Sequence, residues 1–469
     1  MISVSKAKVN ILRKGKGPEL TGRIVVPGDT QYNAARREFN TFFNKFPLVI
    51  VFAQETKDVT NAILWARHWD VPIRMRSGRH SYEGLSVVDS GIVIDVSEML
   101  QLDVERRNET VTLQTGFRDS AIDEILGSEG LAVPTGLCPT TGVAGYTLGG
   151  GQSKLSRSLG LIIDNLLELE MVDADGRVIR ANANHNADLF WASRGGGGGN
   201  FGITTSFRFR THSIDTVAFA NIGWNLRDLV PVLRSWQLLT VPSSDDRLTP
   251  LLTIVNGLKS SSSTKVFNTS FPLQMQGVFL GPVSELRKLL DPLLQAGSPQ
   301  QVFIEEIPWL EAVERIAVSQ PESEPFKSVG PFVNHLLPDE GITKIQRFIN
   351  DPPTSSVAIL FHGLGGAVAN VPSNATAYYY RRALYNMSIW STWSTPEGAA
   401  PGIRWVEDLR RAMLPFTQGV YVNTPDLSIK NWSKAYYGSN FVRLTRVKAK
   451  YDPENIFNFP QSIPPARGW

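Results

Sequence analysis

Residues 76–84 read RSGRHSYEG and follow directly on a strand-like segment at residues 72–75. A loop of small residues after a strand presents backbone N–H groups in a concave arrangement, which suits a phosphate or pyrophosphate group. His80 lies inside this loop, and an imidazole can act as a base or as a point of covalent attachment. The alternative interpretation is a surface turn that carries an incidental histidine.

A second glycine-rich stretch contains the only cysteine of the chain. Residues 135–151 read TGLCPTTGVAGYTLGGG, and glycines allow a backbone to approach a flat or charged ligand closely. The stretch has neither the Lys-Ser/Thr pair of a P-loop nor a GxGxxG in the expected context. Cys138 is therefore either a small buried hydrophobe or a reactive thiol held against a cofactor.

Two further stretches stand out. Residues 194–202 read RGGGGGNFG, and five successive glycines cost so much backbone entropy that a close approach to a ligand explains them better than a linker does. Residues 448–465 read KAKYDPENIFNFPQSIPP, where Asp452-Pro453 begins a turn and the remainder is typical of a docked tail.

The order of the expected elements indicates an α+β protein. Residues 47–53, 55–70 and 72–75 form a strand–helix–strand unit. Further strands are expected at residues 91–96, 110–114, 166–172 and 202–210, with a hairpin turn at 173–176. After about residue 213, helical patterns at 226–239, 283–294 and 342–349 alternate with strand-like segments at 302–307, 356–363 and 375–393. We predict a lead-in at 1–45 (loosely held around 13–17), a first domain at 46–213, a second at 214–423, and a largely helical C-terminal segment at 424–469.

Composition excludes several classes of protein. The 469 residues are 42% hydrophobic and 19% charged, as in an ordinary folded protein. The net charge of +3 does not favour nucleic acid or an acidic membrane as a partner. One cysteine and six scattered histidines predict neither a disulfide nor a metal site. Without a signal-peptide core or an apolar span, we expect a soluble, cytoplasmic protein.

Taken in order, the four stretches resemble the berberine-bridge-enzyme-like group of the vanillyl-alcohol-oxidase flavoprotein superfamily. The matching motifs are RSGxHSYEG, GxCPTxGxxGyxxGGG, DLFWAxRGGGGGNFG, AYYGxN and KxxYDPxNxFxxxQSI, and they span most of the chain. The resemblance implies a two-subdomain FAD-binding module of the PCMH type, followed by a substrate domain with an antiparallel sheet covered by helices. It also implies FAD bound covalently at two points, through His80 and Cys138.

Other cofactor contacts are implied by the same motifs. The loop from Arg76 to Tyr82 would hold the pyrophosphate through backbone donors, and Gly136 would leave room for dioxygen beside the cofactor. The full set of expected cofactor-binding residues is His80, Cys138, Arg76, Ser77, Gly78, Arg79, Ser81, Tyr82, Gly136, Gly142, Gly145, Tyr146, Gly149, Gly150, Gly199, Ile203, Tyr437 and Asn440.

The chain departs from the family pattern at the positions expected to activate the substrate. Gln152 and Thr424 stand where many microbial members carry an aromatic residue and a second tyrosine, and Ser388 stands near the acidic or amide position of plant members. A hydroxyl without a partner is a poor base at neutral pH. Tyr437 and Tyr380 are therefore the catalytic candidates that remain.

The resemblance implies an oxidase that transfers hydride to FAD from an alcohol, a sugar hemiacetal or an amine-bearing metabolite, with dioxygen reduced to hydrogen peroxide. Trp390, Trp393 and residues 378–380 could provide a stacking surface for the substrate or could be ordinary sheet core. The alternatives are a flavin dehydrogenase with another acceptor and a flavin-binding structural or coat protein with drifted catalysis. The sequence does not identify the substrate, the base, the physiological electron acceptor or the oligomeric state.

Overall fold

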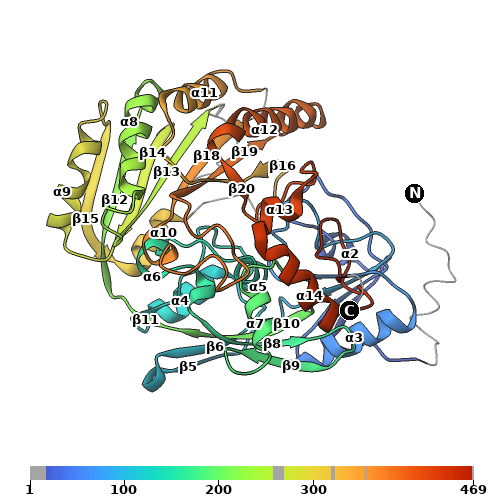
Figure 1. Ribbon diagram of the computed structural model, residues 1–469. Coiled ribbons are helices and arrows are strands. Elements are labelled where there is room, and N and C mark those ends of the chain that lie inside the picture. Colours follow the sequence, from blue (N-terminus) through green and yellow to red (C-terminus); the bar gives the residue numbers. More distant parts are fainter. Residues whose placement is uncertain (1–16, 257–268, 318–322, 354–355, 467–469) are drawn as a thin grey trace.

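The computed structural model describes residues 17–256, 269–317, 323–353 and 356–466, in which two sheet systems face each other (Figure 1). The first sheet of the N-terminal module, which we define as the described residues before 214, has four strands in this part of the chain. It contains β1 (Arg23–Val25), β2 (Val49–Phe52), β4 (Ile92–Asp95) and β3 (Ile73–Arg76), in that order. Strands β2, β4 and β3 are parallel, and β1 is antiparallel to β2.

Helix α3 (Thr56–His68) makes the crossover between β2 and β3. A capping box between Glu55 and Asp58 closes its first turn, and it buries an apolar face that includes Val59 and Ile63. The strand–helix–strand unit predicted from the sequence is therefore present. Residues 23–25 pair with β2, so this part of the predicted lead-in belongs to the sheet, whereas residues 13–16 lie outside the described residues.

The second sheet of the N-terminal module is antiparallel, and five of its strands lie within the described residues. They are β5 (Leu102–Glu105), β6 (Thr110–Gln114), β10 (Ile203–Arg210), β8 (Leu166–Val172) and β9 (Val178–Asn182), in that order. The predicted hairpin turn at 173–176 joins β8 to β9, where the Asp173 carboxylate accepts the backbone N–H groups of Asp175 and Arg177. A short pair, β7 (Leu131–Ala132) and β11 (His212–Ser213), lies beside it.

The other helices of this module are shorter than α3. They are α2 (Tyr32–Ala35), α4 (Asp119–Gly127), α5 (Val143–Leu148), α6 (Ser156–Leu159) and α7 (Ala187–Ser193). Several 3-10 turns connect the elements of the whole chain: Arg106–Asn108, Ile162–Asp164, Leu226–Asp228, Gln237–Thr240, Gly366–Val368, Pro396–Gly398, Leu414–Phe416 and Gly438–Asn440.

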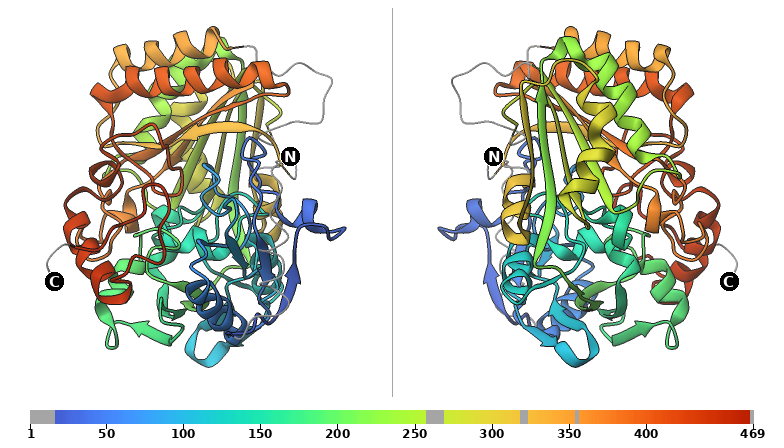
Figure 2. Two further views of the ribbon diagram at one scale, coloured as in Figure 1. Left: turned by 90° about the vertical axis from the view of Figure 1, so that its right-hand side faces the viewer. Right: turned by 90° about the vertical axis from the view of Figure 1, so that its left-hand side faces the viewer.

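The second part is built on one large antiparallel sheet of nine strands, counted over the described residues. The order is β15 (Gln301–Pro308), β12 (Thr216–Trp224), β14 (Leu273–Phe279), β13 (Leu248–Asn256), β18 (Ser356–Gly363), β19 (Tyr385–Thr392), β17 (Pro331–Val333) and β20 (Gln418–Val420), with β16 (Phe326–Val329) also paired to β19. Helices α8 (Leu229–Trp236), α9 (Val283–Leu294), α11 (Asp339–Asn350) and α12 (Ala399–Met413) pack on it and cover one face (Figure 2). Helix α10 (Trp309–Ile316) contacts α4 of the N-terminal module.

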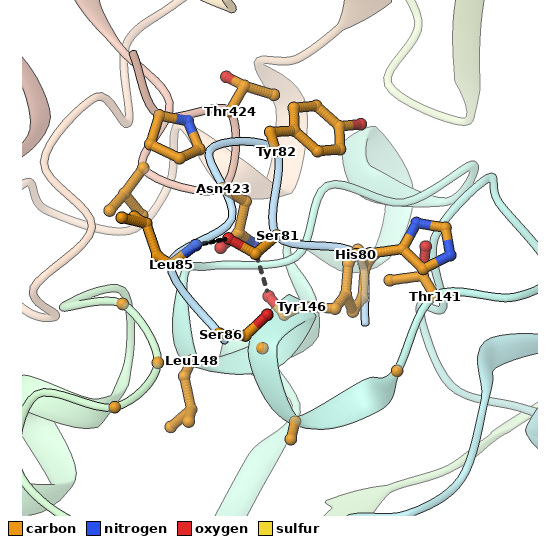
Figure 3. Close-up of a pocket in the computed structure, with 18 of the residues that line it drawn as sticks. His80, Ser81, Tyr82, Leu85, Ser86, Thr141, Tyr146, Leu148, Asn423 and Thr424 are labelled. Carbon is orange, nitrogen blue, oxygen red and sulfur yellow. Dashed lines mark hydrogen bonds between the residues drawn. The ribbon is translucent and has the colours of Figure 1, made fainter. Parts of the chain in front are cut away.

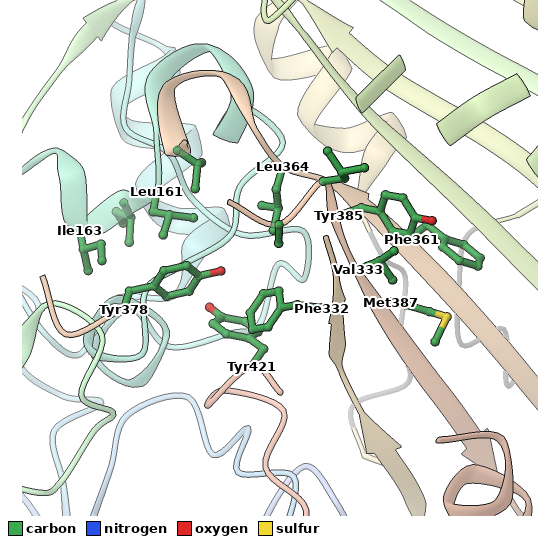
Figure 4. Packing of buried hydrophobic residues seen from close by; sticks show 14 of the residues in the cluster. Leu161, Ile163, Phe332, Val333, Phe361, Leu364, Tyr378, Tyr385, Met387 and Tyr421 are labelled. Atoms are coloured by element: carbon green, nitrogen blue, oxygen red, sulfur yellow. The ribbon is translucent and has the colours of Figure 1, made fainter. Parts of the chain in front are cut away.

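Apolar side chains of both parts form one continuous core. Leu161 and Ile163 of the N-terminal module belong to the same buried cluster as Phe332, Phe361 and Tyr385 of the large sheet (Figure 4). The chain then returns to the N-terminal module, where α13 (Trp432–Tyr437) leads into α14 (Phe441–Tyr451), which packs on α7.

One predicted strand is partly wrong. Residues 375–393 were expected to be a single strand, but β19 covers only Tyr385–Thr392, and residues 375–384 are irregular. Tyr378 in this segment joins no sheet and packs against the glycine loops of the N-terminal module. The contact is close: an added Cβ at Gly150 or Gly195 would lie within 2.6 Å of Tyr378. Its backbone N–H donates to Arg194 O.

Candidate active site

A cavity of about 360 Å³ lies between the N-terminal module and the large sheet, and it collects the motif residues. Its walls come from residues 75–86, 136–152 and 197–204, from β18 and β19, and from the C-terminal stretches 421–425 and 459–461. This volume lies within the range of small-molecule and cofactor sites. Segments that are far apart in the sequence therefore converge on one ligand site.

The loop after β3 lines this cavity with residues that include His80, Ser81 and Tyr82 (Figure 3). Within the described residues, the N–H groups of residues 77–82 donate no hydrogen bond to the protein. Arg79 has a φ of 65°, a conformation that a non-glycine residue adopts at a cost. A row of unpaired N–H groups in a fixed loop suits an anion, and binding of a pyrophosphate here stays a prediction.

The guanidinium of Arg76 is buried beneath this loop and is hydrogen-bonded within the protein. It donates to Asp95 at 2.7 Å, to Glu38 at 3.0 Å and to the Ala35 carbonyl oxygen. All three ionic side chains are buried, and the two carboxylates raise the pKa of Arg76 despite the opposing effect of burial. Arg76 therefore supports the loop through two carboxylates.

Two motif loops touch through glycines. A Cβ on Gly78 would lie 2.2 Å from the backbone N of Gly142, and a Cβ on Gly142 would lie 2.2 Å from the backbone N of Gly78. By contrast, a Cβ on Gly145 would meet nothing within 4 Å and would enter the cavity. The first two glycines let the loops meet, and the third leaves space for a ligand.

We expect Gly78→Ala to separate these loops and to lower the amount of cofactor bound, because the added methyl group collides with backbone atoms that cannot rotate away. The measurement is the ratio of flavin absorbance to protein absorbance after purification. Gly341→Ala in α11, where an added Cβ makes only ordinary contacts, is the control. Equal ratios in Gly78→Ala and wild type would contradict the close approach.

His80 and Cys138 meet at Thr140. The Nε2 atom of His80 lies 2.9 Å from Thr140 Oγ1, and the Cys138 Sγ lies 3.5 Å from the same oxygen, so the two side chains are close neighbours. The His80 ring is stacked on Phe39, and both His80 and Cys138 line the cavity. Burial, helped by the charge of Arg118, lowers the pKa of His80 to about 3, so the imidazole is neutral at pH 7 and keeps a lone pair. Burial raises the pKa of the Cys138 thiol.

The side chains of the three residues that replace the usual catalytic groups are hydrogen-bonded to neighbouring groups of the protein. Gln152 donates through Nε2 to Tyr378 Oη at 3.2 Å, Ser388 donates to Asn386 Oδ1 at 3.0 Å, and Thr424 donates to the Tyr421 carbonyl oxygen at 3.0 Å. All three line the cavity. They provide neutral polar surface and no group with the basicity of a general base.

Tyr421 also lines the cavity and was missed in the sequence analysis. It follows β20 directly, and its phenol oxygen accepts hydrogen bonds from the Gly151 N–H and from Asn423 Nδ2, each at 2.9 Å. Tyr421 stands three positions before Thr424, where the family pattern led us to expect a tyrosine. The presence of a tyrosine at another position of the same motif was the sequence signal that could have identified Tyr421.

Several expected contact residues do not line the cavity among the described residues. Gly149 lies against the Asn423 amide, and Gly150 lies against the Tyr378 ring. Asn440 donates to the carbonyl oxygens of Ser373, Thr376 and Ala377, so its amide holds the irregular segment. These three residues contact other parts of the protein next to the cavity and do not line it.

The two tyrosines expected to be catalytic have structural hydrogen bonds. Tyr380 lies outside the cavity, in the segment wrongly predicted as a strand, and donates to the Lys434 carbonyl oxygen at 3.0 Å. Tyr437 lines the cavity but donates to the Gly196 carbonyl oxygen at 2.9 Å, and burial raises its pKa far above the usual value. Each phenol therefore has a backbone acceptor, and a catalytic role for either tyrosine stays a prediction.

Gly136 lines the cavity, and Asp119 and Tyr146 lie close to it. A Cβ there would lie 2.7 Å from Asp119 Oδ2 and 3.0 Å from the Tyr146 ring, so a side chain would first displace Asp119. Burial and the nearby Asp123 raise the pKa of Asp119 to about 8. The expectation that Gly136 leaves room for dioxygen beside the cofactor stays a prediction.

The remaining expected residues, Ser77, Ser81, Tyr82, Tyr146, Gly199 and Ile203, line the cavity. Trp390 lines it too but is stacked on Phe326 and buried, while Trp393 packs edge-on to Phe42. In the described ranges, no group of three His, Cys, Asp or Glu side chains could hold a metal ion. No helix in the same ranges is long and apolar enough to cross a membrane.

An anion-binding loop, a glycine-lined cavity and a neutral histidine beside a thiol define a flavin-binding oxidoreductase fold. The family model described as FAD binding domain matches residues 47–182, and the one described as Berberine and berberine like matches residues 420–464. An uncharacterised FAD-linked oxidoreductase of Bacillus subtilis, YvdP, is 41% identical over 96% of this chain and 99% of its own length. The chain thus belongs to the berberine-bridge-enzyme-like family of FAD-linked oxidoreductases.

Solved structures agree with this assignment. BBE-like 1 of Physcomitrella patens is 28% identical with a TM-score of 0.87, over 98% of this chain and 100% of that one. A chitooligosaccharide oxidase is 25% identical with a TM-score of 0.85, over the same shares. The α+β fold, with an FAD-binding module and a helix-covered antiparallel sheet, is confirmed.

Proposed function

We propose that this protein oxidises a hydroxyl group of a neutral carbohydrate, using FAD attached to His80 and Cys138 and dioxygen as the final acceptor, which becomes hydrogen peroxide. The observation that carries the proposal is the single cavity that has His80 and Cys138 in one wall and neutral polar side chains of the large sheet in another. The chitooligosaccharide oxidase shares this fold.

The residues present fit FAD. The unpaired N–H groups of residues 77–82 match a pyrophosphate, and the open space at Gly145 admits a flat group. His80 would hold the cofactor through a ring nitrogen and Cys138 through its sulfur. When bound, FAD supplies a two-electron acceptor for hydride.

The charge of the cavity favours an alcohol over an amine. Among the described residues, the lining contains no aspartate, glutamate or lysine, and its charged side chains are Arg76 and Arg79 in the anion-binding loop. A substrate ammonium group would meet no carboxylate and would lose its hydration without compensation. Gln152, Ser388, Asn423 and His362 can instead hydrogen-bond the hydroxyl groups of a sugar.

The experiment is anaerobic mixing of the purified yellow protein with cellobiose or chitobiose, followed by admission of oxygen. We expect the flavin absorbance near 450 nm to bleach and then to return with stoichiometric peroxide. Bleaching that returns without peroxide only when an artificial acceptor is added would identify a dehydrogenase. No bleaching with either sugar would overturn the carbohydrate assignment.

A further inference from the structure

Tyr421 lines the cavity, and the hydrogen bonds of its phenol oxygen leave the phenol proton without an acceptor among the described residues. This oxygen accepts hydrogen bonds from the Gly151 N–H and from Asn423 Nδ2, and it donates to none of the described residues. We propose that Tyr421 is the catalytic residue that takes the proton of the substrate hydroxyl, an inference that rests on the proposed function. The two N–H donors make it a prepared phenolate site.

The donors around the Tyr421 oxygen resemble those of an oxyanion hole. Fixed N–H donors aimed at an oxygen stabilise its negative form, and they do so more strongly in a cavity from which water is excluded. Asn423 is itself fixed, since its Nδ2 also donates to the Tyr146 carbonyl oxygen at 2.9 Å. Gly149 makes room for it, because a Cβ there would lie 1.9 Å from Asn423 Oδ1. This gives a local reason for a glycine at position 149.

The surroundings set the pH at which Tyr421 ionises. Burial raises its pKa to about 12, while hydrogen bonding by the Gly151 backbone, the Asn423 side chain and the Gln152 backbone acts in the opposite direction. The titratable neighbours are Tyr82, Tyr146, Tyr378, Asp119, and, in the same cavity, His80, Cys138 and His362. The raised pKa of Asp119 and the lowered pKa values of the two histidines leave these groups neutral at pH 7. Activity is therefore expected to increase as the pH rises.

The substrate O–H proton passes to the Tyr421 phenolate oxygen, and the carbinol C–H bond breaks with both electrons leaving as hydride to FAD, the oxidant of the proposed function. The alcohol becomes a carbonyl compound, Tyr421 becomes a neutral phenol, and the cofactor gains two electrons. The Tyr421 proton then returns to solvent.

Other cavity groups are less suitable. His362 has Nε2 at 2.9 Å from the Ser153 carbonyl oxygen, and burial lowers its pKa to about 4, so it is a weak base. The phenol of Tyr437 already donates a hydrogen bond to the Gly196 carbonyl oxygen. Tyr378, whose ring centroid lies 6.1 Å from that of Tyr421 (Figure 4), is not among the cavity-lining residues.

The test is anaerobic stopped-flow reduction of the flavin by cellobiose and by chitobiose between pH 6 and 10. We expect the wild-type rate to rise roughly tenfold per pH unit, and Tyr421→Phe to lose this slope and ~10²–10⁴-fold in rate at pH 9. Asn423→Ala should displace the rise to higher pH, which marks Asn423 as a positioning residue. Site-specific 3,5-difluorotyrosine at 421, which is more acidic, should displace it to lower pH.

Tyr378→Phe is the matched control and should keep the wild-type profile, because it removes a neighbouring phenol that does not line the cavity. A Tyr421→Phe rate within a few-fold of wild type, with the slope retained, would overturn the inference. If neither sugar reduces the wild-type flavin, the proposed function fails. The inference is then decided by tyrosinate absorbance at 295 nm: the phenol absent from Tyr421→Phe should ionise at a lower pH than the phenol absent from Tyr378→Phe, and the reverse order would overturn it.

Discussion

The double variant His80→Ala/Cys138→Ala is expected to release all of its flavin on acid precipitation, whereas the wild-type precipitate stays yellow. Both side chains contact Thr140 Oγ1, so both can reach one edge of the same ligand. The neutral His80 imidazole has the free lone pair that bond formation requires. The measurement is flavin absorbance in the supernatant and in the pellet.

The single variants separate the two attachment points. His80→Ala and Cys138→Ala should each keep flavin in the pellet through the remaining bond, because each bond forms on a different side chain. Thr140→Val, which removes only the shared hydroxyl partner, is expected to retain attachment at both sites. A single variant that releases as much flavin as the double variant would show that only one covalent bond exists.

Arg76→Leu is expected to lower the free energy of unfolding by about 3–5 kcal/mol, because it leaves Glu38 and Asp95 as uncompensated buried carboxylates. The measurement is the urea midpoint of the flavin-loaded protein. Arg180→Leu breaks an exposed pair with Glu170 and is the control, with little expected change. Equal midpoints for the two variants would contradict the supporting role of Arg76.

The same variant should show a defined pH dependence. Burial raises the pKa of Glu38 in the folded state even beside Arg76, and without the Arg76 charge this pKa lies further above its value in the unfolded chain, so the folded state binds more protons. Stability then falls as the pH rises through this folded-state pKa. We therefore expect the deficit relative to wild type to be smaller at pH 5 than at pH 8. A loss of stability relative to wild type that is larger at pH 5 than at pH 8 would contradict this expectation.

Local patterns predicted many elements well. The alternation at residues 166–172 and the apolar spacing at 283–294 correspond to β8 and α9 with the same bounds. The segment 375–384 failed because its run of tyrosines has high strand propensity, yet Tyr378 packs against glycines of another module. Such a contact depends on tertiary structure and leaves no local pattern.

The cofactor end of the site was easier to predict than the substrate end. His80 and Cys138 lie in distinctive motifs, and the structure brings them together at Thr140. Tyr421 was missed because its environment depends on Gly151, which lies 270 positions away in the chain. Asn440 was assigned to the cofactor by its motif, although its amide is used by backbone carbonyl groups.

The central claim is that His80 and Cys138 hold one FAD in the cavity between the two parts of the molecule. The most direct measurement is the mass of denatured wild-type protein, followed by mapping of its proteolytic peptides. The account predicts the polypeptide plus one FAD, with the His80 peptide and the Cys138 peptide joined through the same flavin. A mass equal to that of the polypeptide alone, from protein that was yellow before denaturation, would contradict it.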